Sequence, residues 1–231
     1  NASYVTLAMP FASNFDDDST DFNSSTTTGN YVATGTGIAP YIETGVSKFY
    51  NGSVKFSGNS NGYLVDSTND GKYNFGTNDF TIEAWIYLPE NVNDYGGIWS
   101  CNTGTNPVPK IQFNVRGGNK LSFHTNGFSS NVADTKSTSS IPLNTWTHVA
   151  VVRKNQMCTF YFNGIADNSF ACATNVTFAD NVPAYVGYPG EVSSGVIPLN
   201  GNINDLRIYN GYAKEYTGVT VISTDPANSK M

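Results

Sequence analysis

The chain has 231 residues, of which 13% are aromatic and only 13% are charged, and its formal net charge is −6. This length fits one all-β domain, because such domains often reach about 200–250 residues. No run of basic residues is longer than Arg153-Lys154. The sequence therefore lacks the clustered cations of a phosphate-binding surface, and we expect no nucleic-acid partner. No apolar stretch approaches the about 20 residues of a membrane helix, so we expect no membrane insertion either.

The N-terminal region combines one predicted strand with a polar loop. Tyr4–Met9 alternates as a strand, and the polar segment at about 14–30 is expected to be a long surface loop. This loop holds the densest acidic cluster, Asp16, Asp17 and Asp18. Oxygen ligands in a loop can hold Ca²⁺, but the spacing is not that of an EF-hand, and a solvated acidic loop is the alternative. We expect no other metal and no cofactor.

Short alternations of apolar and polar residues predict half-buried strands along the rest of the chain. The clearest is Phe80–Leu88, where Phe80 and Ile82 share one face and Glu83 and Trp85 share the other. No window of about 11 residues or more has a convincing helical period, so the sequence predicts an all-β sandwich or barrel of about a dozen strands. The further predicted strands are Ile111–Arg116, Leu121–His124, Trp146–Arg153, Cys158–Phe162, Ala184–Tyr188 and Asn202–Tyr209.

Asn-Gly dipeptides mark hairpin turns, because both residues of a type I′ turn need a positive φ. A turn of this kind at Asn163-Gly164 pairs Phe162 with Ile165 and Cys158 with Ser169.

The same register bears on the cysteines, which number 3. Cys172 would lie well beyond the partner of Cys158, and a disulfide needs Cα atoms within about 7 Å. An odd count in a chain of this length also does not indicate a disulfide framework. We therefore expect Cys101, Cys158 and Cys172 to be free thiols.

Six segments in order carry a resemblance that covers the chain from about Tyr4 to Tyr216. They are FASNFDDDST, KFYNGSVKFSGNSNGYLV, FGTNDFTIEAWIYLP, WTHVAVVR, FYFNG and LNGNINDLRIYNG. Together they resemble the laminin-G-like branch of the concanavalin A-like lectin/glucanase superfamily. The resemblance implies one domain over 1–231, with a C-terminal extension at about 217–231, folded as a two-sheet antiparallel jelly-roll sandwich.

The run from Lys48 to Tyr87, followed by DLRIYNGYAK, is similar to versions found in tailed-phage virion proteins. This implies a non-enzymatic protein of the virion surface, outside the cell, that decorates the capsid or forms part of a tail fibre. Its partners would be other virion proteins, host-surface glycans or both, and neither role excludes an oligomer. The alternative is a carbohydrate-binding module of a secreted bacterial protein.

Enzymatic relatives within this superfamily carry their catalytic acids on a strand written Glu-x-Asp-x-x-Glu. Retaining hydrolysis needs two carboxyl groups about 5–5.5 Å apart. The corresponding strand here offers Glu83, Trp85 and Tyr87, which is one carboxylate followed by two aromatic rings. The histidines, His124 and His148, have no catalytic or zinc-binding spacing to other residues. We expect no catalytic residues, and we interpret Glu83 as a solvated or hydrogen-bonded strand residue.

The polar faces of the predicted strands suggest a binding surface instead. If these strands are neighbours in one sheet, their aromatic rings, amides, carboxylate and guanidinium form a single field. Sugars bind such surfaces, because their C–H faces pack on rings while their hydroxyl groups bond to polar tips. The alternative is that long loops cover this face and bury Trp85. The candidate ligand-binding residues are Glu83, Trp85, Tyr87, Gln112, Asn114, Arg116, His124 and Tyr161.

Overall fold

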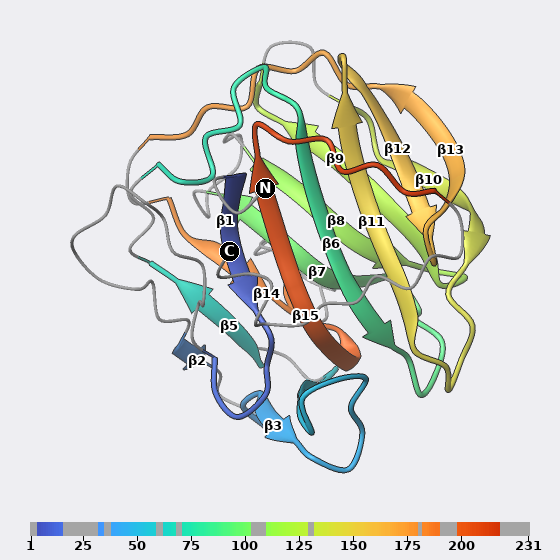
Figure 1. Cartoon of the computed structure of the whole chain (residues 1–231). Helices are drawn as coiled ribbons and strands as arrows, with labels where there is room; N and C mark the ends of the chain where they lie inside the picture. Colours follow the sequence, from blue (N-terminus) through green and yellow to red (C-terminus); the bar gives the residue numbers. More distant parts are fainter. Residues whose placement is uncertain are drawn as a thin grey trace.

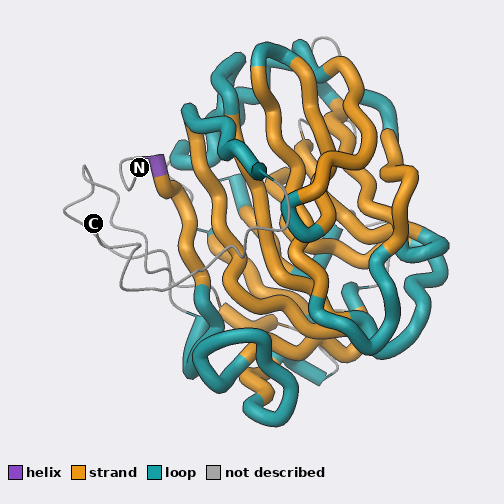
Figure 2. The backbone as a smooth tube through the Cα atoms, turned by 45° about the vertical axis from the view of Figure 1, so that its right-hand side comes forward, coloured by secondary structure: helices purple, strands orange, loops and turns teal. Residues whose placement is uncertain are grey.

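The computed structural model describes residues 4–15, 32–34, 38–58, 62–67, 71–102, 110–128, 132–179, 182–189 and 198–217. Two antiparallel sheets, packed face to face, make up this part of the chain (Figure 1). Figure 2 shows that loops join the strands around the rim of the two layers. No α-helix occurs in the described ranges, and no helix there is long and apolar enough to cross a membrane. The predicted two-sheet antiparallel sandwich is thus confirmed.

Sheet A is 8-stranded, and its strands come from both ends and the middle of the chain. β1 (Val5–Met9) pairs only with β15, beside the main path. In spatial order the path is β13 (Ile165–Ala171), β12 (Met157–Phe162), β11 (Thr147–Lys154), β6 (Phe80–Tyr87), β15 (Asn200–Asn210), β4 (Ser53–Ser57) and β3 (Tyr41–Glu43).

Sheet B is 7-stranded and is built largely from the middle of the chain. In spatial order it contains β10 (Thr135–Ser140), β9 (Lys120–Asn126), β8 (Lys110–Arg116), β7 (Tyr95–Asn102), β14 (Ala184–Val186), β5 (Tyr63–Asp66) and β2 (Val32–Thr34). β7, β8 and β9 follow one another in sequence and in space, so they form a meander at the centre of this sheet.

The strands predicted from alternation are present with small shifts at their ends. β2, β3, β4, β5, β7 and β10 were not among them, and β7 and β10 show why. β7 reads YGGIWSCN, in which two glycines interrupt the pattern, and a bulge lies between Gly97 and Trp99. β10 reads TKSTSS, which has no apolar residue to alternate with, and only its Ser137 is buried. Neither strand therefore carries the apolar period on which the prediction depended.

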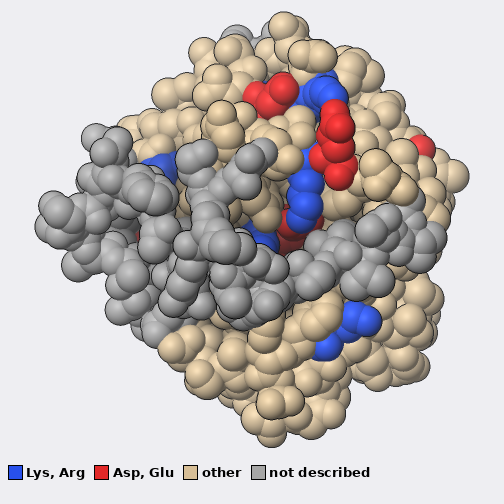
Figure 3. Space-filling model, in the orientation of Figure 1, with Lys and Arg blue, Asp and Glu red and all other residues tan. Residues whose placement is uncertain are grey.

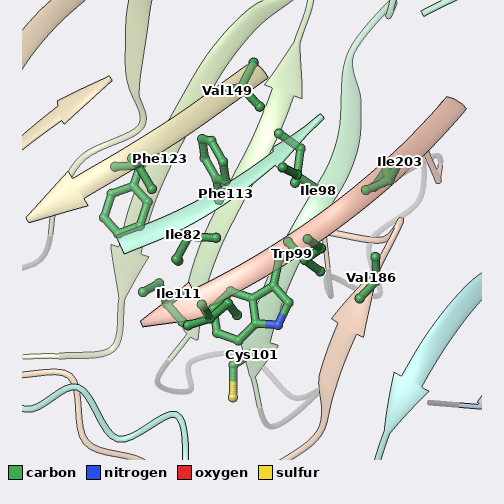
Figure 4. Packing of buried hydrophobic residues seen from close by; sticks show 14 of the residues in the cluster. Ile82, Ile98, Trp99, Cys101, Ile111, Phe113, Phe123, Val149, Val186 and Ile203 are labelled. Atoms are coloured by element: carbon green, nitrogen blue, oxygen red, sulfur yellow. The ribbon is translucent and has the colours of Figure 1, made fainter. Parts of the chain in front are cut away.

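The core lies between the sheets and is formed by the apolar half of each alternation (Figure 4). Ile82 and Val149 of sheet A face Phe113 and Phe123 of sheet B, and all of them are fully buried. Trp99 packs among them as a buried ring. Because these residues point inward, the polar residues between them must point outward from the two sheets. The sandwich therefore presents two separate outer faces.

The hairpin at Asn163-Gly164 forms with a positive φ at both turn residues, and its Phe162–Ile165 pair is confirmed. The predicted pairing of Cys158 with Ser169 is wrong, because an irregularity between Thr159 and Tyr161 shifts the register by one.

Cys158 instead lies opposite Phe170, and the shift brings its thiol into contact with that of Cys172. Both cysteines, like Cys101, are free and buried. The expectation of free thiols is confirmed, but its reason, that the register keeps Cys172 away from Cys158, is wrong.

Candidate functional site

The candidate binding residues do not share one face. Those of β6 and β12, namely Glu83, Trp85, Tyr87 and Tyr161, lie on the outer face of sheet A. Those of β8 and β9, namely Gln112, Asn114, Arg116 and His124, lie on the outer face of sheet B. The expectation that these strands are neighbours in one sheet is wrong. Alternation fixes which side of a strand is polar, but it does not show which sheet the strand joins.

On sheet A, Glu83 is the centre of a buried polar cluster. Its carboxylate accepts hydrogen bonds from Lys214 Nζ at 2.6 Å and from the Tyr216 hydroxyl at 2.6 Å. His148 Nε2 lies 3.1 Å from the same carboxylate. Burial alone would raise the pKa of Glu83, but Lys214 and His148 outweigh it and hold the pKa well below its usual range. Glu83 is thus a charged, fully engaged group, in line with its reading as a hydrogen-bonded strand residue.

Two partners of Glu83, Lys214 and Tyr216, come from the segment after β15, which crosses the outer face of sheet A over β6, β11 and β12 (Figure 1). Thr81 fixes this segment, donating to the carbonyl of Tyr212 at 3.0 Å and accepting from the amide of Lys214 at 2.9 Å. Acidic and basic side chains gather on this face of the molecule (Figure 3). The exposed pair Lys154–Glu215, 2.7 Å apart, belongs to the same crossing. We call residues 212–217 the clasp.

Trp85 lies beside the clasp and is half-buried by other side chains. Lys48 Nζ lies 4.5 Å from the centre of its ring, and the Phe49 ring packs edge-on at 5.6 Å. The His148 ring is also 5.6 Å away. Among the residues that the structure describes, the indole nitrogen and His148 Nδ1 find no hydrogen-bond partner. The loop at 48–50 therefore covers part of this face, as the alternative for Trp85 anticipated.

The two remaining sheet A candidates also contact protein groups. Tyr87 packs near Trp146 at 5.6 Å and donates to Asn144 Oδ1 at 3.3 Å. Tyr161 and Tyr216 are 4.7 Å apart at their ring centres. They line a hollow of about 320 Å³ between the clasp and β12.

On sheet B, three successive outward side chains of β8 carry polar atoms that have no partner among the described residues. Gln112 and Asn114 are fully buried although they face away from the core. Asn114 Oδ1 and Nδ2, Gln112 Oε1 and Arg116 Nη1 are all enclosed without a hydrogen-bond partner among the described residues. Leaving such a group unpaired costs about 1–3 kcal/mol. We call Gln112, Asn114 and Arg116 the β8 row. Because Gln112 and Asn114 have no exposed surface, only water or another group that reaches beneath the cover of this face can pair with their open polar atoms.

A backbone segment borders this row on one side. Tyr188 and Pro189 cross β7 and β8, where the carbonyl of Tyr188 accepts from Ser100 Oγ at 3.0 Å and that of Pro189 accepts from Gln112 Nε2. They pack directly over Gly97, where a Cβ would meet the Tyr188 carbonyl carbon at 2.1 Å. Gly97 is paired with Asn114 across the sheet. The absence of a side chain at Gly97 thus lets this segment lie flat beside the β8 row.

Arg116 is the last residue of the row, at the end away from Gln112. Its guanidinium stacks on the ring of Tyr95 at 3.2 Å, and its Nη2 lies 3.4 Å from Asp134 and 3.9 Å from Asp94. Asp134 also accepts from Ser122 Oγ at 2.6 Å, next to Asn114 in the register. His124, the fourth candidate on this face, lies opposite Gln112.

Sequence reasoning missed an aromatic cluster on the same face. Tyr63 stacks on Tyr188 at 4.7 Å, and Tyr185 packs edge-on against both, at 5.6 and 5.7 Å. All three are half-buried. The outward position of Tyr185 could have been inferred from the alternation of Ala184–Tyr188, but the contact with Tyr63 depends on the pairing of β5 with β14. Sheet B therefore places aromatic rings on one side of the Tyr188–Pro189 segment and polar groups on the other.

A metal centre finds no support in the described part of the chain, where no group of three or more His, Cys, Asp or Glu residues could hold an ion. The expected calcium ligands Asp16, Asp17 and Asp18 lie outside the described residues.

The two-sheet architecture agrees with the comparison of the sequence with protein families. A family model described as the concanavalin A-like lectin/glucanases superfamily, Laminin_G_3, matches residues 57–215, which is more than half of the chain. The chain belongs to this superfamily. No curated protein matches the sequence.

Several solved structures share the fold at low sequence identity. Domain 4 of AbnA, a GH43 extracellular arabinanase from Geobacillus stearothermophilus solved with arabinotriose, is 18% identical, with a TM-score of 0.66 over 91% of this chain and 94% of that one. The binding domain of Paraclostridial Mosquitocidal Protein 1 is 17% identical, with a TM-score of 0.65 over 99% of this chain. The match spans only 51% of that domain.

An enzyme is also among the similar structures. Trypanosoma rangeli sialidase is 16% identical, with a TM-score of 0.51 over 78% of this chain but only 28% of the sialidase. At these identities the likeness shows the shared fold.

Proposed function

We propose that this chain is a non-enzymatic carbohydrate-binding module and that the sugar binds on the outer face of sheet B. The observation that carries the proposal is the row of buried, unpartnered polar atoms on Gln112, Asn114 and Arg116. These residues were among the binding candidates predicted from the sequence. The other half of that set, on sheet A, mostly contacts the protein's own side chains.

The chemistry of this row suits a polyhydroxylated ligand. The Asn114 amide offers donors on Nδ2 and an acceptor on Oδ1, Gln112 offers an acceptor and Arg116 offers a donor. Adjacent sugar hydroxyls donate and accept at once, so one sugar ring can satisfy several of these atoms. Tyr95 at one border, and Tyr63, Tyr185 and Tyr188 at the other, supply rings for the apolar C–H faces.

The similar structures support the same class of function. The arabinanase domain was solved with arabinotriose, and the mosquitocidal protein fragment is a binding domain. For this chain we propose binding without turnover. Glu83, the acid on the strand that corresponds to the catalytic strand of the glucanases, is buried under the clasp and fully engaged with Lys214, Tyr216 and His148.

The carrier of the module is a separate proposal. The resemblance of the run from Lys48 to Tyr87 to tailed-phage proteins favours the surface of a virion. The similarity to domain 4 of an extracellular arabinanase favours a secreted bacterial protein. Mass spectrometry of purified particles distinguishes the two, because the chain is present in particles only in the first case.

A glycan array with site variants tests the proposed function. Asn114→Ala should weaken the strongest array signals by about tenfold or more, the equivalent of a lost buried hydrogen bond. Trp85→Ala, a control on the opposite face, should leave them unchanged if its thermal melt shows that the fold persists. Loss of signal in Trp85→Ala but not in Asn114→Ala would move the site to sheet A. Polysaccharide turnover that Glu83→Gln abolishes would contradict a purely binding role.

A further inference from the structure

A second hollow lies at the end of the sandwich, next to the β8 row. Its volume is about 170 Å³, and the segment Glu90–Tyr95 forms most of its wall. The polar and aromatic groups that line it are Glu90, Asn91, Asn93, Asp94, Tyr95 and Asn200. Of these, Glu90, Asn91, Asn93 and Asp94 are exposed, so the hollow is open to solvent.

Tyr95 joins this hollow to the β8 row. Its side chain lines the hollow, while its ring stacks at 3.2 Å on the guanidinium of Arg116. Tyr95 is also the direct cross-strand partner of Arg116. A ligand seated on the β8 row that extends past Arg116 therefore reaches the hollow by way of the Tyr95 ring. One sugar ring cannot occupy both places, so this arrangement suits a chain of linked sugars.

The charge of the hollow restricts which sugars can enter it. Glu90 and Asp94 are acidic, and no Lys or Arg is among the described residues that line the hollow. The nearest guanidinium, that of Arg116, is already shared by Asp94 and Asp134. A carboxylate or sulfate on the sugar unit in the hollow would thus meet the like charges of Glu90 and Asp94, whereas the open Nη1 of Arg116 belongs to the β8 row. A hydroxyl group can instead donate to either carboxylate, and such charge-assisted bonds are strong.

The wall of the hollow is held in a fixed shape. Asn119 bridges it, because its Oδ1 accepts from the amide of Val92 at 2.9 Å and its Nδ2 donates to Asn91 Oδ1 at 2.9 Å. Asn200 Nδ2 donates to Glu90 Oε1 at 2.6 Å. These bonds use only part of the capacity of each carboxylate and amide oxygen. The remaining lone pairs can accept from a ligand without rearrangement of the loop.

From this geometry we infer that the module selects uncharged oligosaccharides over single sugars and over acidic glycans, with one unit on the β8 row and the next over Tyr95 in the hollow. The inference rests on the proposed function and specifies its ligand class. Tyr95, Glu90 and Asp94 are its specificity-determining residues. None of them was a binding candidate from the sequence, because the loop at 90–95 carries no alternation.

The test is an array that prints neutral oligosaccharides of one to four units beside counterparts bearing a uronic or sialic acid. We expect the signal to rise with chain length and each neutral chain to exceed its acidic counterpart by about tenfold, a difference of about 1.4 kcal/mol. Tyr95→Ala should remove the gain with length. The double variant Glu90→Gln/Asp94→Asn should reduce the difference in array signal between neutral and acidic chains. Asp94 has a side chain 58% exposed, so its substitution spares the fold.

The outcomes separate this inference from the proposed function. If Asn114→Ala abolishes binding but the signal of the unmodified protein does not depend on chain length, the inference is wrong and the proposed function stands. The same holds if the unmodified protein prefers acidic chains. The inference is also wrong if neither Tyr95→Ala nor the double variant changes the array signals. No binding to any printed glycan by the folded protein overturns both.

Discussion

At the scale of single residues, Glu83 shows how an outward strand position becomes a buried ionic cluster. Its hydrogen-bonding partners Lys214 and Tyr216 follow it by 131 and 133 residues. The alternation of β6 predicts that Glu83 faces away from the core, but only the path of the clasp determines that it is 1% exposed. A buried charge of this kind is stable only while its partners are present.

Glu83→Gln should therefore destabilise the fold by about 3 kcal/mol at neutral pH, because it removes one charge from a buried cluster. The folded-state pKa of Glu83 is depressed. Its contribution is consequently complete above the unfolded-state pKa of about 4.3 and is lost as pH falls below that value towards the folded pKa. Urea unfolding at several pH values checks both points.

The control is the slope of stability against pH. The free energy of unfolding of Glu83→Gln should fall less steeply below about pH 4.3 than that of the unmodified protein, since the variant lacks this titrating group. Equal slopes in the two proteins would show that Glu83 contributes no pH-dependent stability.

At the scale of elements, the β11–β12 hairpin uses a turn that the dipeptide signal did not reveal. Lys154 pairs with Met157, so Asn155 and Gln156 form the turn, and their φ values are 50° and 64°. The residues predicted as hairpin turns were Asn-Gly pairs, whereas here an exposed glutamine adopts the left-handed conformation. That conformation costs an ordinary residue about 1–2 kcal/mol.

Gln156→Gly should stabilise the protein by about 0.5–1 kcal/mol, because relief of this strain exceeds the extra entropy that glycine gains in the unfolded chain. Chemical denaturation measures the change. Gly164→Ala, at φ 77° in the neighbouring hairpin, is the matched opposite and should destabilise. A destabilising Gln156→Gly would mean that the side chain makes a contribution larger than the strain.

The burial of the cysteines predicts how they react with alkylating reagents. Burial, together with contact with the Cys172 thiol, raises the pKa of Cys158, and the same contact lowers the pKa of Cys172. All three thiols are buried, however, which keeps alkylating reagents away from them. All three cysteines should therefore resist alkylation in the native protein and react once it is unfolded without reductant. A mass-spectrometric count of fewer than three alkylated cysteines after unfolding would contradict this prediction. Cys158–Cys172 would then be the disulfide to test first, because these two thiols are in contact.

At the scale of the whole molecule, the sequence predicted the sandwich but not the division of its outer faces. Alternation in β6, β8 and β9 correctly assigned inward and outward residues, because burial of one face is a local property of each strand. The order of strands in each sheet depends on pairing between distant segments, which local patterns do not encode. As a result, the predicted binding set contained Asn114 and Trp85 together, although they lie on opposite faces, and it lacked Tyr95 and Tyr188.

The central claim is that sugar binds the β8 row on sheet B, and side-chain NMR signals test it most directly. The amide groups of Gln112 and Asn114 and the indole of Trp85 each give resolvable N–H signals, assigned by substitution. On titration with the strongest neutral oligosaccharide from the array, the Gln112 and Asn114 side-chain signals should shift in proportion to occupancy while the Trp85 indole stays in place. A shift of the Trp85 indole with unchanged Gln112 and Asn114 side-chain signals would contradict the account.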